Sequence, residues 1–221
     1  MTVLPTLWGI EASLFDMDGT LVLTEDRTDA AITALLDTHH ISMGDLDLSR
    51  FHGVTWVYTA AQLTERWPTL ADVDIPSELQ RLFQGALVAE PPRPVPGAVE
   101  AVRAAAAVMP TAIVTSSNRE TAELVCDQLE IRAPLGAVIT AEDCTSSKPS
   151  PQPFMLAAER LGVDPRRCLV FEDSAAGVQG AKAAGASVIA IGAESGHASW
   201  ISDYGELPRD FFTRAVRPTD D

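Results

Sequence analysis

Short apolar runs and helix-patterned stretches alternate along most of the chain. Five short apolar runs, the last four of them rich in valine and isoleucine, each lead into polar residues, which is typical of buried strands that stop at a polar loop. These runs cover residues 12–16, 111–115, 137–140, 168–171 and 186–191. Apolar residues spaced three and four apart predict helices between them, over residues 97–108, 119–129, 151–161 and 175–184. The alternation predicts an α/β core, in which a doubly wound (Rossmann-like) parallel sheet is covered by helices on both faces.

A helical segment interrupts this alternation after the first strand. Helical periodicity without a good strand runs from Thr24 to Glu90, at residues 30–36, 57–63 and 79–87. The stretch from Pro91 to Gly97 is too rich in proline for a helix or a central strand, so we predict a stiff linker there. We expect a small helical cap domain at residues 24–92, inserted into a core domain of residues 1–23 and 93–221. The cap would lie over the carboxyl ends of the strands, where such sheets bind ligands.

Charge and hydropathy exclude several classes of protein. The 221 residues include 16 Lys and Arg against 31 Asp and Glu, which gives a net charge of −15. A broad basic face is therefore not expected, and this argues against nucleic acid as a partner. No apolar run approaches the roughly 20 residues of a membrane span, and the first ten residues lack a basic region, so neither a membrane partner nor secretion is expected.

Three cysteines, Cys126, Cys144 and Cys168, bear on the compartment. Their number is odd and they lack Cys-x-x-Cys spacing, so neither a disulfide framework nor a zinc knuckle is supported. A cytoplasmic location fits best. A monomer is the default expectation for a chain of this size.

Two carboxylates stand where the first strand is predicted to stop. Asp16 and Asp18 lie two residues apart, with Gly19 allowing a sharp turn behind them. A carboxylate is ionised at neutral pH and can accept a phosphoryl group as a nucleophile. The second carboxyl could protonate a leaving alkoxide and later activate water, provided that its pKa is raised. Taken alone, the pair is equally compatible with a loop that makes a turn or caps the next helix.

Three further strand ends carry polar residues. Thr115, Ser116 and Asn118 offer hydroxyls and backbone N–H groups suited to phosphate oxygens, or they form a helix N-cap. Lys148 precedes Pro149, which biases its backbone toward an extended conformation. A lysine held there could neutralise charge between a carboxylate and a phosphate, although a lone Lys-Pro is usually a surface loop.

Adjacent acids follow the fourth strand. Glu172 and Asp173 could join Asp16 in an oxygen site for Mg²⁺, or they could cap the helix that starts at Ser174. Each motif has an ordinary structural alternative. Their joint occurrence at successive strand ends favours a single reaction site.

At these positions the chain resembles the haloacid dehalogenase superfamily. The resemblance rests on Asp16-Met17-Asp18-Gly19-Thr20, Thr115, Lys148-Pro149 and Glu172-Asp173. Residues 147–151 and 171–178 are typical of the β-phosphoglucomutase-like branch, which has a small helical cap. The resemblance covers nearly the whole chain up to Gly192. It implies Mg²⁺-dependent phosphoryl transfer through an aspartyl phosphate on Asp16, since dehalogenase members lack the second aspartate.

The resemblance also implies a role for each site residue. Mg²⁺ would be held by the Asp16 carboxylate, the Asp18 backbone carbonyl and Asp173, with help from Glu172. Lys148, Thr115 and the N–H groups near Ser116 would stabilise the transferring oxygens. Substrate would be bound by Thr115, Ser116, Asn118 and Lys148, and by His52, Gly53 and Trp56 of a cap loop that reads the leaving group.

Within the branch, the chain is most similar to phosphatases of sugar and polyol phosphates, such as the glycerol-phosphate and 2-deoxyglucose-6-phosphate enzymes. Trp56 stands where the mutase carries an arginine that holds a second phosphate, and a histidine expected near Thr28 is absent. Arg27 is the one nearby residue that could replace that arginine, and Trp56 could instead serve cap packing. The expected partner is a small phosphorylated metabolite. A phosphosugar mutase and a non-catalytic phosphosugar-binding module stay open as alternatives to the phosphatase.

Overall fold

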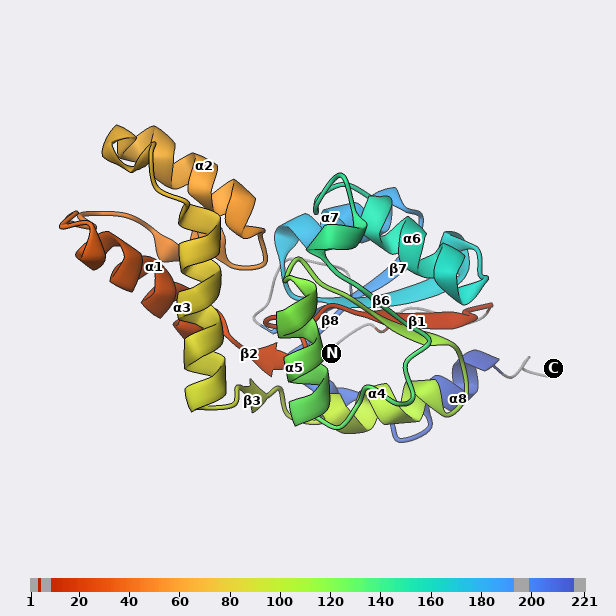
Figure 1. The fold of residues 1–221 in the computed structure, drawn as a ribbon. Coiled ribbons are helices and arrows are strands. Elements are labelled where there is room, and N and C mark those ends of the chain that lie inside the picture. The colour runs from red at the N-terminus through yellow and green to blue at the C-terminus, as the bar shows by residue number, and fades with distance from the viewer. Residues whose placement is uncertain (1–3, 5–8, 193–198, 217–221) are drawn as a thin grey trace.

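A six-stranded parallel sheet forms the centre of the computed structural model, which describes residues 4, 9–192 and 199–216. The strand order is β5-β4-β1-β6-β7-β8, and every neighbouring pair is parallel (Figure 1). The strands are β1 (Ala12–Phe15), β4 (Thr111–Val114), β5 (Ala137–Ile139), β6 (Cys168–Glu172), β7 (Ser187–Ile191) and β8 (Trp200–Ile201). The predicted α/β fold is confirmed, and β1 lies in the interior of the sheet between β4 and β6.

Helices cover both faces of this sheet. They are α4 (Ala98–Ala106), α5 (Arg119–Gln128), α6 (Gln152–Leu161), α7 (Ala175–Ala183) and α8 (Phe211–Val216). Side chains alternate along a strand, so Leu14 of β1 faces α6 and α7, while Phe15 faces α4, α5 and α8. Figure 1 shows the two helical layers above and below the sheet. Each layer encloses its own apolar cluster, and the two clusters together hold the strands in place.

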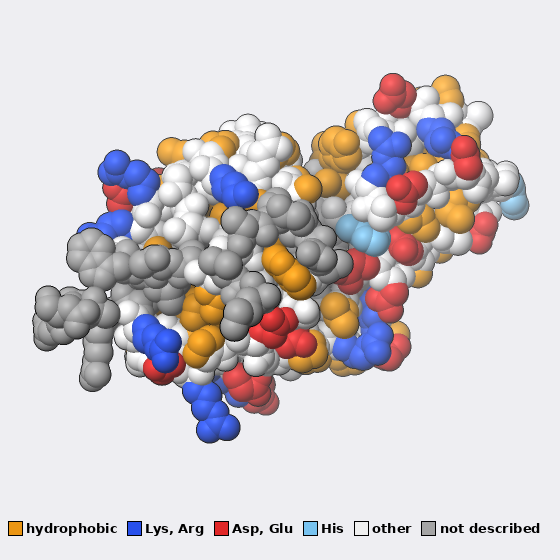
Figure 2. Space-filling view, turned by 180° about the vertical axis from the view of Figure 1, so that it is seen from behind, with side chains coloured by type: hydrophobic (Ala, Val, Ile, Leu, Met, Phe, Trp, Pro, Cys, Tyr) orange, Lys and Arg blue, Asp and Glu red, His pale blue; other side chains and the backbone are white. Residues whose placement is uncertain are grey.

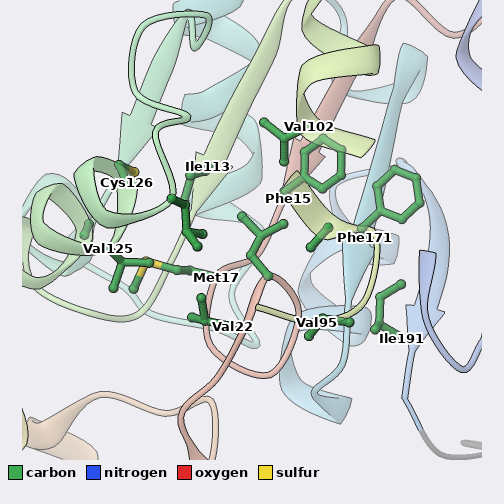
Figure 3. Packing of buried hydrophobic residues seen from close by; sticks show 14 of the residues in the cluster. Phe15, Met17, Val22, Val95, Val102, Ile113, Val125, Cys126, Phe171 and Ile191 are labelled. Atoms are coloured by element: carbon green, nitrogen blue, oxygen red, sulfur yellow. The ribbon is translucent and has the colours of Figure 1, made fainter. Parts of the chain in front are cut away.

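The segment after Gly192 carries structure that the pattern did not predict. It adds β8 to the sheet edge and places Tyr204, Phe211 and Phe212 against the rings of β1 and β6. Phe15 and Phe171 lie side by side (Figure 3) and stack with their centroids 4.7 Å apart. Asp16 follows Phe15 in the chain, and Glu172 follows Phe171. The packing of these rings therefore fixes the backbone beside two of the candidate site residues.

The first three α-helices of the described chain form a separate group beside the sheet (Figure 1). They are α1 (Glu25–Thr38), α2 (Trp56–Arg66) and α3 (Ile75–Ala89). These helices enclose an apolar core of their own, with Leu35, Leu63, Leu79 and Phe83 almost fully buried. Short 3₁₀ helices complete the chain at Leu48–Phe51, Pro68–Leu70, Ala141–Asp143, Pro165–Arg167 and Tyr204–Glu206.

The chain leaves the sheet and returns to it through a short two-stranded ribbon. In this ribbon β2 (Val22–Leu23) pairs antiparallel with β3 (Arg93–Pro94), and Val95 N–H donates to the Leu21 carbonyl. The proline-rich stretch forms no helix and no central strand, as predicted, but it does supply this short pair. Val22 and Val95 point into the apolar core near Met17 (Figure 3). Both connections are therefore packed against the core.

The surface matches the acidic composition. On the face drawn in Figure 2, the described Lys and Arg side chains are scattered among acidic ones rather than gathered into one patch. Within the part of the chain that the structure describes, no helix is long and apolar enough to cross a bilayer.

Candidate active site

The carboxyl ends of β1, β4 and β6 bring the candidate residues together. Because β4 and β6 flank β1, residues Asp16, Thr115 and Glu172 follow three adjacent strands at one edge of the sheet. The Asp16 N–H donates to the Phe171 carbonyl, 3.0 Å away, which fixes Asp16 beside the end of β6. This edge also faces the three cap helices (Figure 1).

Lys148 forms the centre of a buried charge cluster. Its Nζ lies 2.5 Å from Asp16 Oδ1 and 2.6 Å from Glu172 Oε1, and all three residues are at most 6% exposed. Burial opposes the charge on Lys148, but Asp16 and Glu172 outweigh it and raise the pKa of the ammonium group. The Lys148 side chain is therefore buried in the charge cluster, although Thr145, Ser146, Ser147 and Pro149 of the same loop are exposed.

A group of three carboxylates surrounds the end of β1. Asp16, Glu172 and Asp173 each present an oxygen, and these oxygens lie within 4.8 Å of one another. Burial, together with the charges of Asp16 and Glu172, raises the pKa of Asp173 well above its ordinary value. One ammonium cannot neutralise three carboxylates. The excess negative charge and the all-oxygen donor set suit a hard divalent cation such as Mg²⁺.

Two glycines leave room for these carboxylates. A Cβ on Gly19 would lie 2.1 Å from Asp173 Oδ2, and Gly19 also has a positive φ of 81°. A Cβ on Gly177 of α7 would lie 1.7 Å from Glu172 Oε1. Gly177 thus gives space to a site carboxylate. A larger residue at either position would collide with one of the three carboxylates.

Asp18 is held by three hydroxyls from two segments of the chain. Its Oδ2 accepts hydrogen bonds from Ser117 Oγ (2.7 Å) and Thr115 Oγ1 (3.3 Å), and its Oδ1 accepts one from Thr24 Oγ1 (2.8 Å). Burial nevertheless raises the pKa of Asp18, although these three hydrogen bonds lower it. A raised pKa is the property that a general acid needs at neutral pH.

The loop after β4 lines the cavity and also caps a helix. Ser116 lines the cavity above Asp16 and Asp18, and the Thr115 hydroxyl accepts a hydrogen bond from the Ser117 N–H. Asn118 caps α5, since its Oδ1 accepts the Thr121 N–H at 3.0 Å. The N-cap alternative is thus correct for the side-chain amide oxygen of Asn118. Asn118 also lines a groove between cap and core that is described below.

Apolar cap residues close the cavity over the two aspartates. The cavity has a volume of about 30 Å³, room for about one water molecule. Its lining comprises Asp16, Asp18, Thr28, Phe51, Gly53, Val54, Trp56, Phe83, Ser116 and Ser117. Among the described residues that line it, no lysine or arginine comes from the cap.

Two larger hollows continue outward from this cavity past Ser116, Thr55 and Val57. One, of about 230 Å³, extends to Lys148, and the other, of about 380 Å³, passes Gln80 and Glu142. Together they form a groove between cap and core, which we call the outer groove.

The remaining predicted cap residues lie in different surroundings. Trp56 lines the cavity and packs edge-on against Phe83, so it serves cap packing, and its contact with substrate stays a prediction. His52 contacts Asp29 of α1 at 2.9 Å and is absent from the lining of the cavity. Arg27 pairs with Asp26 and with the Glu90 carbonyl, which directs its guanidinium away from the reaction site.

Sequence reasoning missed several residues of this site. Ser117 and Thr24 hold Asp18, and Thr20 donates to Asp173 at 3.0 Å. Ser117 and Thr20 stand inside motifs that were recognised, so their hydroxyls were a usable signal. Tyr204 is buried near the three carboxylates, which together with burial raise its pKa well above the ordinary value. Its hydroxyl has no hydrogen-bond partner among the described residues, and no pattern near position 204 indicated this placement.

Known proteins with similar sequences are phosphatases. The chain is 30% identical to fructose-1-phosphate phosphatase YqaB of Escherichia coli K12 over 80% of this chain and 94% of the relative. It is also 30% identical to validoxylamine A 7'-phosphate phosphatase of Streptomyces hygroscopicus subsp. limoneus, over 85% and 87% of the two chains. These names agree with the prediction of a phosphoric monoester hydrolase.

Solved structures and a family model agree on the fold. The crystal structure of β-phosphoglucomutase from Clostridium difficile superposes with a TM-score of 0.79 over 93% of this chain and 96% of that one, at 20% identity. A family model described as haloacid dehalogenase-like hydrolase matches residues 10–185, which include each of the strand-end motifs described above. The chain therefore belongs to the haloacid dehalogenase-like hydrolase family.

Proposed function

We propose that this chain is a Mg²⁺-dependent phosphatase that hydrolyses a small sugar or polyol phosphate through an aspartyl phosphate on Asp16. The observation that carries the proposal is the pairing of two differently placed carboxyls. Asp16 contacts a buried ammonium and two further carboxylates, whereas Asp18 contacts three hydroxyls. The first environment suits a nucleophile beside a cation. In the second, burial raises the pKa of Asp18 despite the three hydrogen bonds, which suits an acid that must hold a proton.

In the first step the Asp16 carboxylate attacks phosphorus. A bond forms between an Asp16 oxygen and phosphorus, the ester P–O bond breaks, and Asp18 gives its proton to the leaving alkoxide. Lys148 and the groups of the loop after β4 stabilise negative charge on the transferring oxygens. Three hydroxyl contacts hold the Asp18 carboxyl in one orientation toward the leaving group.

In the second step water attacks phosphorus of the aspartyl phosphate. Asp18, now ionised, takes a proton from the water, the bond between Asp16 and phosphorus breaks, and phosphate is released. Asp16 and Asp18 return to their starting states. The same residue thus acts first as acid and then as base, which requires one carboxyl within reach of both the leaving group and the water.

The candidate metal ligands are the Asp16 and Asp173 carboxylates, with Glu172 nearby and the Asp18 backbone carbonyl as a further oxygen. When bound there, Mg²⁺ would offset the repulsion between the Asp16 carboxylate and the phosphate dianion. The two glycines that leave room for Asp173 and Glu172 support this assignment.

A neutral leaving group fits the cap side of the cavity best. Its cap lining is apolar apart from Thr28, and the outer groove adds the Glu142 carboxylate. A mutase must clamp a second phosphate with a cation, and Arg27 is engaged with Asp26 and Glu90. The names of the relatives, which include a fructose-1-phosphate phosphatase and hexitol phosphatase A, agree with a polyhydroxy leaving group. The complete set of charged site residues argues against a non-catalytic binding module.

Cap movement is part of this proposal. A cavity of about 30 Å³ cannot admit a sugar phosphate, so the cap must open to bind it and close before reaction. We propose that residues 24–92 move as the cap domain against the core of residues 1–23 and 93–221. The ribbon of β2 and β3 is the place where both connections cross.

A phosphate-release screen tests the proposal. Purified chain is given fructose 1-phosphate, hexitol phosphates, glycerol 1-phosphate, phosphoglycolate and β-glucose 1-phosphate, with Mg²⁺ or with excess chelator. We expect hydrolysis of at least one neutral-alcohol phosphate, loss of that activity in chelator, and no turnover by Asp16→Asn. Full activity in chelator would refute the proposed dependence on Mg²⁺. A lack of turnover with every ester would refute the proposed phosphatase activity.

The mutase alternative needs a different readout. β-Glucose 1-phosphate with catalytic glucose 1,6-bisphosphate should yield free phosphate far faster than glucose 6-phosphate, as followed by phosphorus NMR. Dominant glucose 6-phosphate would favour the mutase instead.

A further inference from the structure

Gln80 of α3 connects the cap loop to the core through two hydrogen bonds. Trp56 Nε1 donates to Gln80 Oε1 at 3.0 Å, and Gln80 Nε2 donates to Thr121 Oγ1 at 2.9 Å. An indole N–H can only donate, so the amide oxygen must face Trp56 and the amide nitrogen must face Thr121. The orientation of the Gln80 amide is therefore determined by its two partners.

The two partners belong to opposite sides of the reaction site. Trp56 lines the cavity above Asp16 and Asp18, where the leaving group would lie, and its ring packs on Phe83. Thr121 is buried in the first turn of α5, directly after the loop that would hold the phosphate. Gln80 thus links a residue of the leaving-group side to the helix that follows the phosphate side.

The cap loop has a second contact with the core at its other end. Gly53 has a positive φ of 71°, and a Cβ at this position would lie 2.9 Å from the Cβ of Ser174. Ser174 follows Glu172 and Asp173 and caps α7. The loop from Gly53 to Trp56 is therefore connected to the core in two places. Gly53 lies directly against Ser174, beyond the end of β6, and Trp56 is linked through Gln80 to Thr121, beyond the end of β4.

We propose that Gln80 is a positioning residue that holds Trp56 against the leaving group when the cap lies on the core. The inference rests on the proposed function and adds a specificity determinant to it. The contact between Gln80 and Thr121 joins cap to core, so it forms only when the cap is closed. Substrates whose leaving groups touch Trp56 depend on this contact, and substrates with very small leaving groups do not.

A set of variants separates this role from a purely structural one. Gln80→Met keeps the length of the side chain and removes both hydrogen bonds. Thr121→Val removes the core partner alone. Gln80→Glu keeps an acceptor for Trp56 and offers another to the Thr121 hydroxyl, so it should restore the link. Gln84→Met is the matched control, because Gln84 lies one turn further along α3 and its amide nitrogen is buried without a partner in the described chain.

The readout is kcat and KM for two substrates, acetyl phosphate and the sugar phosphate that ranks first in the screen. Gln80→Met should raise KM for the sugar phosphate about tenfold, as expected from the loss of one or two hydrogen bonds. Its kinetics with acetyl phosphate should change less than about twofold on the same grounds. Gln80→Glu should recover most of the loss, and Gln84→Met should match the unaltered chain.

A double variant completes the test. Gln80→Met combined with Thr121→Val should be no worse than the more impaired single variant, because both remove one link. Three outcomes would each overturn the inference. These are a loss in the double variant equal to the product of the two single losses, equal losses of Gln80→Met with both substrates, and normal kinetics of Gln80→Met. If Gln80→Met does not fold, Thr121→Val with the same two substrates decides. An unaltered chain that hydrolyses no phosphate ester would instead refute the proposed function.

Discussion

The core and the cap both line one cavity, but the core contributes buried charged residues and the cap contributes mainly apolar ones. On the core side, Lys148, Asp16 and Glu172 are buried and contact one another directly, and Asp18 accepts three hydrogen bonds. On the cap side, Phe51, Val54 and Phe83 contribute apolar surface, and the polar link to the core described above passes through Gln80. In the proposed mechanism the core side acts on the phosphate group of any ester, while the cap side selects by shape and polarity.

This difference predicts how variants will divide. Changes on the core side should lower activity with every sugar phosphate, because they alter the reacting groups. Changes on the cap side should redistribute activity among substrates and leave the chemistry itself in place. The predictions below test that division, beginning with the largest effect.

Asp16→Asn should abolish turnover of all phosphate esters. An amide of the same shape cannot accept the phosphoryl group, and the fold should persist because the strand and its apolar support are unchanged. Phosphate release measures the first point and circular dichroism the second. A pure sample that kept a substantial rate with any ester would remove Asp16 from the role of nucleophile.

Asp18→Asn should slow hydrolysis of sugar phosphates by roughly 10²- to 10⁴-fold, the usual contribution of general acid catalysis. The formation of the aspartyl phosphate from p-nitrophenyl phosphate should suffer less, since nitrophenolate leaves without a proton. Rapid-quench measurement of the nitrophenol burst compares the two esters. Equal losses in this first step would contradict the acid role of Asp18.

Stability should depend on pH and Mg²⁺ through the acidic group. Burial raises the pKa of Asp16, Glu172 and Asp173. Folding therefore favours their protonated forms. In the metal-free chain, the contribution of these three carboxyls to the free energy of unfolding is fully present below about pH 4 and is lost as the pH rises through their folded-state pKa values. A bound divalent cation favours the ionised forms.

Mg²⁺ should consequently raise Tm more at neutral pH than in acidic buffer. Thermal unfolding with and without Mg²⁺ at several pH values measures this, with Asp173→Asn as the variant in which the effect shrinks. A Tm increase that was equal at all pH values would argue that the ion binds elsewhere.

The smallest effect is expected from the cap. Trp56→Arg places a cation in the cavity and should raise the relative kcat/KM for a sugar bisphosphate over a sugar monophosphate by about three- to tenfold, the range of a partly exposed ion pair. Val88→Arg is the charge-matched control, since Val88 is 70% exposed on α3 and does not line the described cavity. An equal change in both variants would mean that the added charge acts at long range and not in the cavity.

The same contrast explains what the sequence could predict. Asp16 and Glu172 were predictable, because each stands at the end of a local apolar run and parallel strands bring their carboxyl ends to one edge. Lys148 follows a polar loop instead, and its signal was the Lys148-Pro149 motif of the family resemblance. The hydrogen bonds of Thr24 to Asp18 and of Gln80 to Thr121 depend on how the cap sits on the core, which no local pattern specifies. His52 was predicted to bind substrate from the cap loop, but its ring contacts Asp29 and does not line the cavity.

The C-terminal segment shows the same limit. A two-residue strand such as β8 is too short to leave a periodic signal, and Tyr204 is buried only because its neighbours are Phe15 and Phe171 from distant strands. Its surroundings are a property of the assembled sheet.

The most direct test of the central claim is to isolate the phosphorylated enzyme. Asp18→Asn can still form the aspartyl phosphate from p-nitrophenyl phosphate but lacks the base that hydrolyses it, so the intermediate should accumulate. Acid quench followed by mass spectrometry of the peptide containing Asp16 should show the added mass of one phosphoryl group, absent from the Asp16→Asn and Asp18→Asn double variant. A phosphoryl group on another residue, or turnover without any covalent intermediate, would contradict the account.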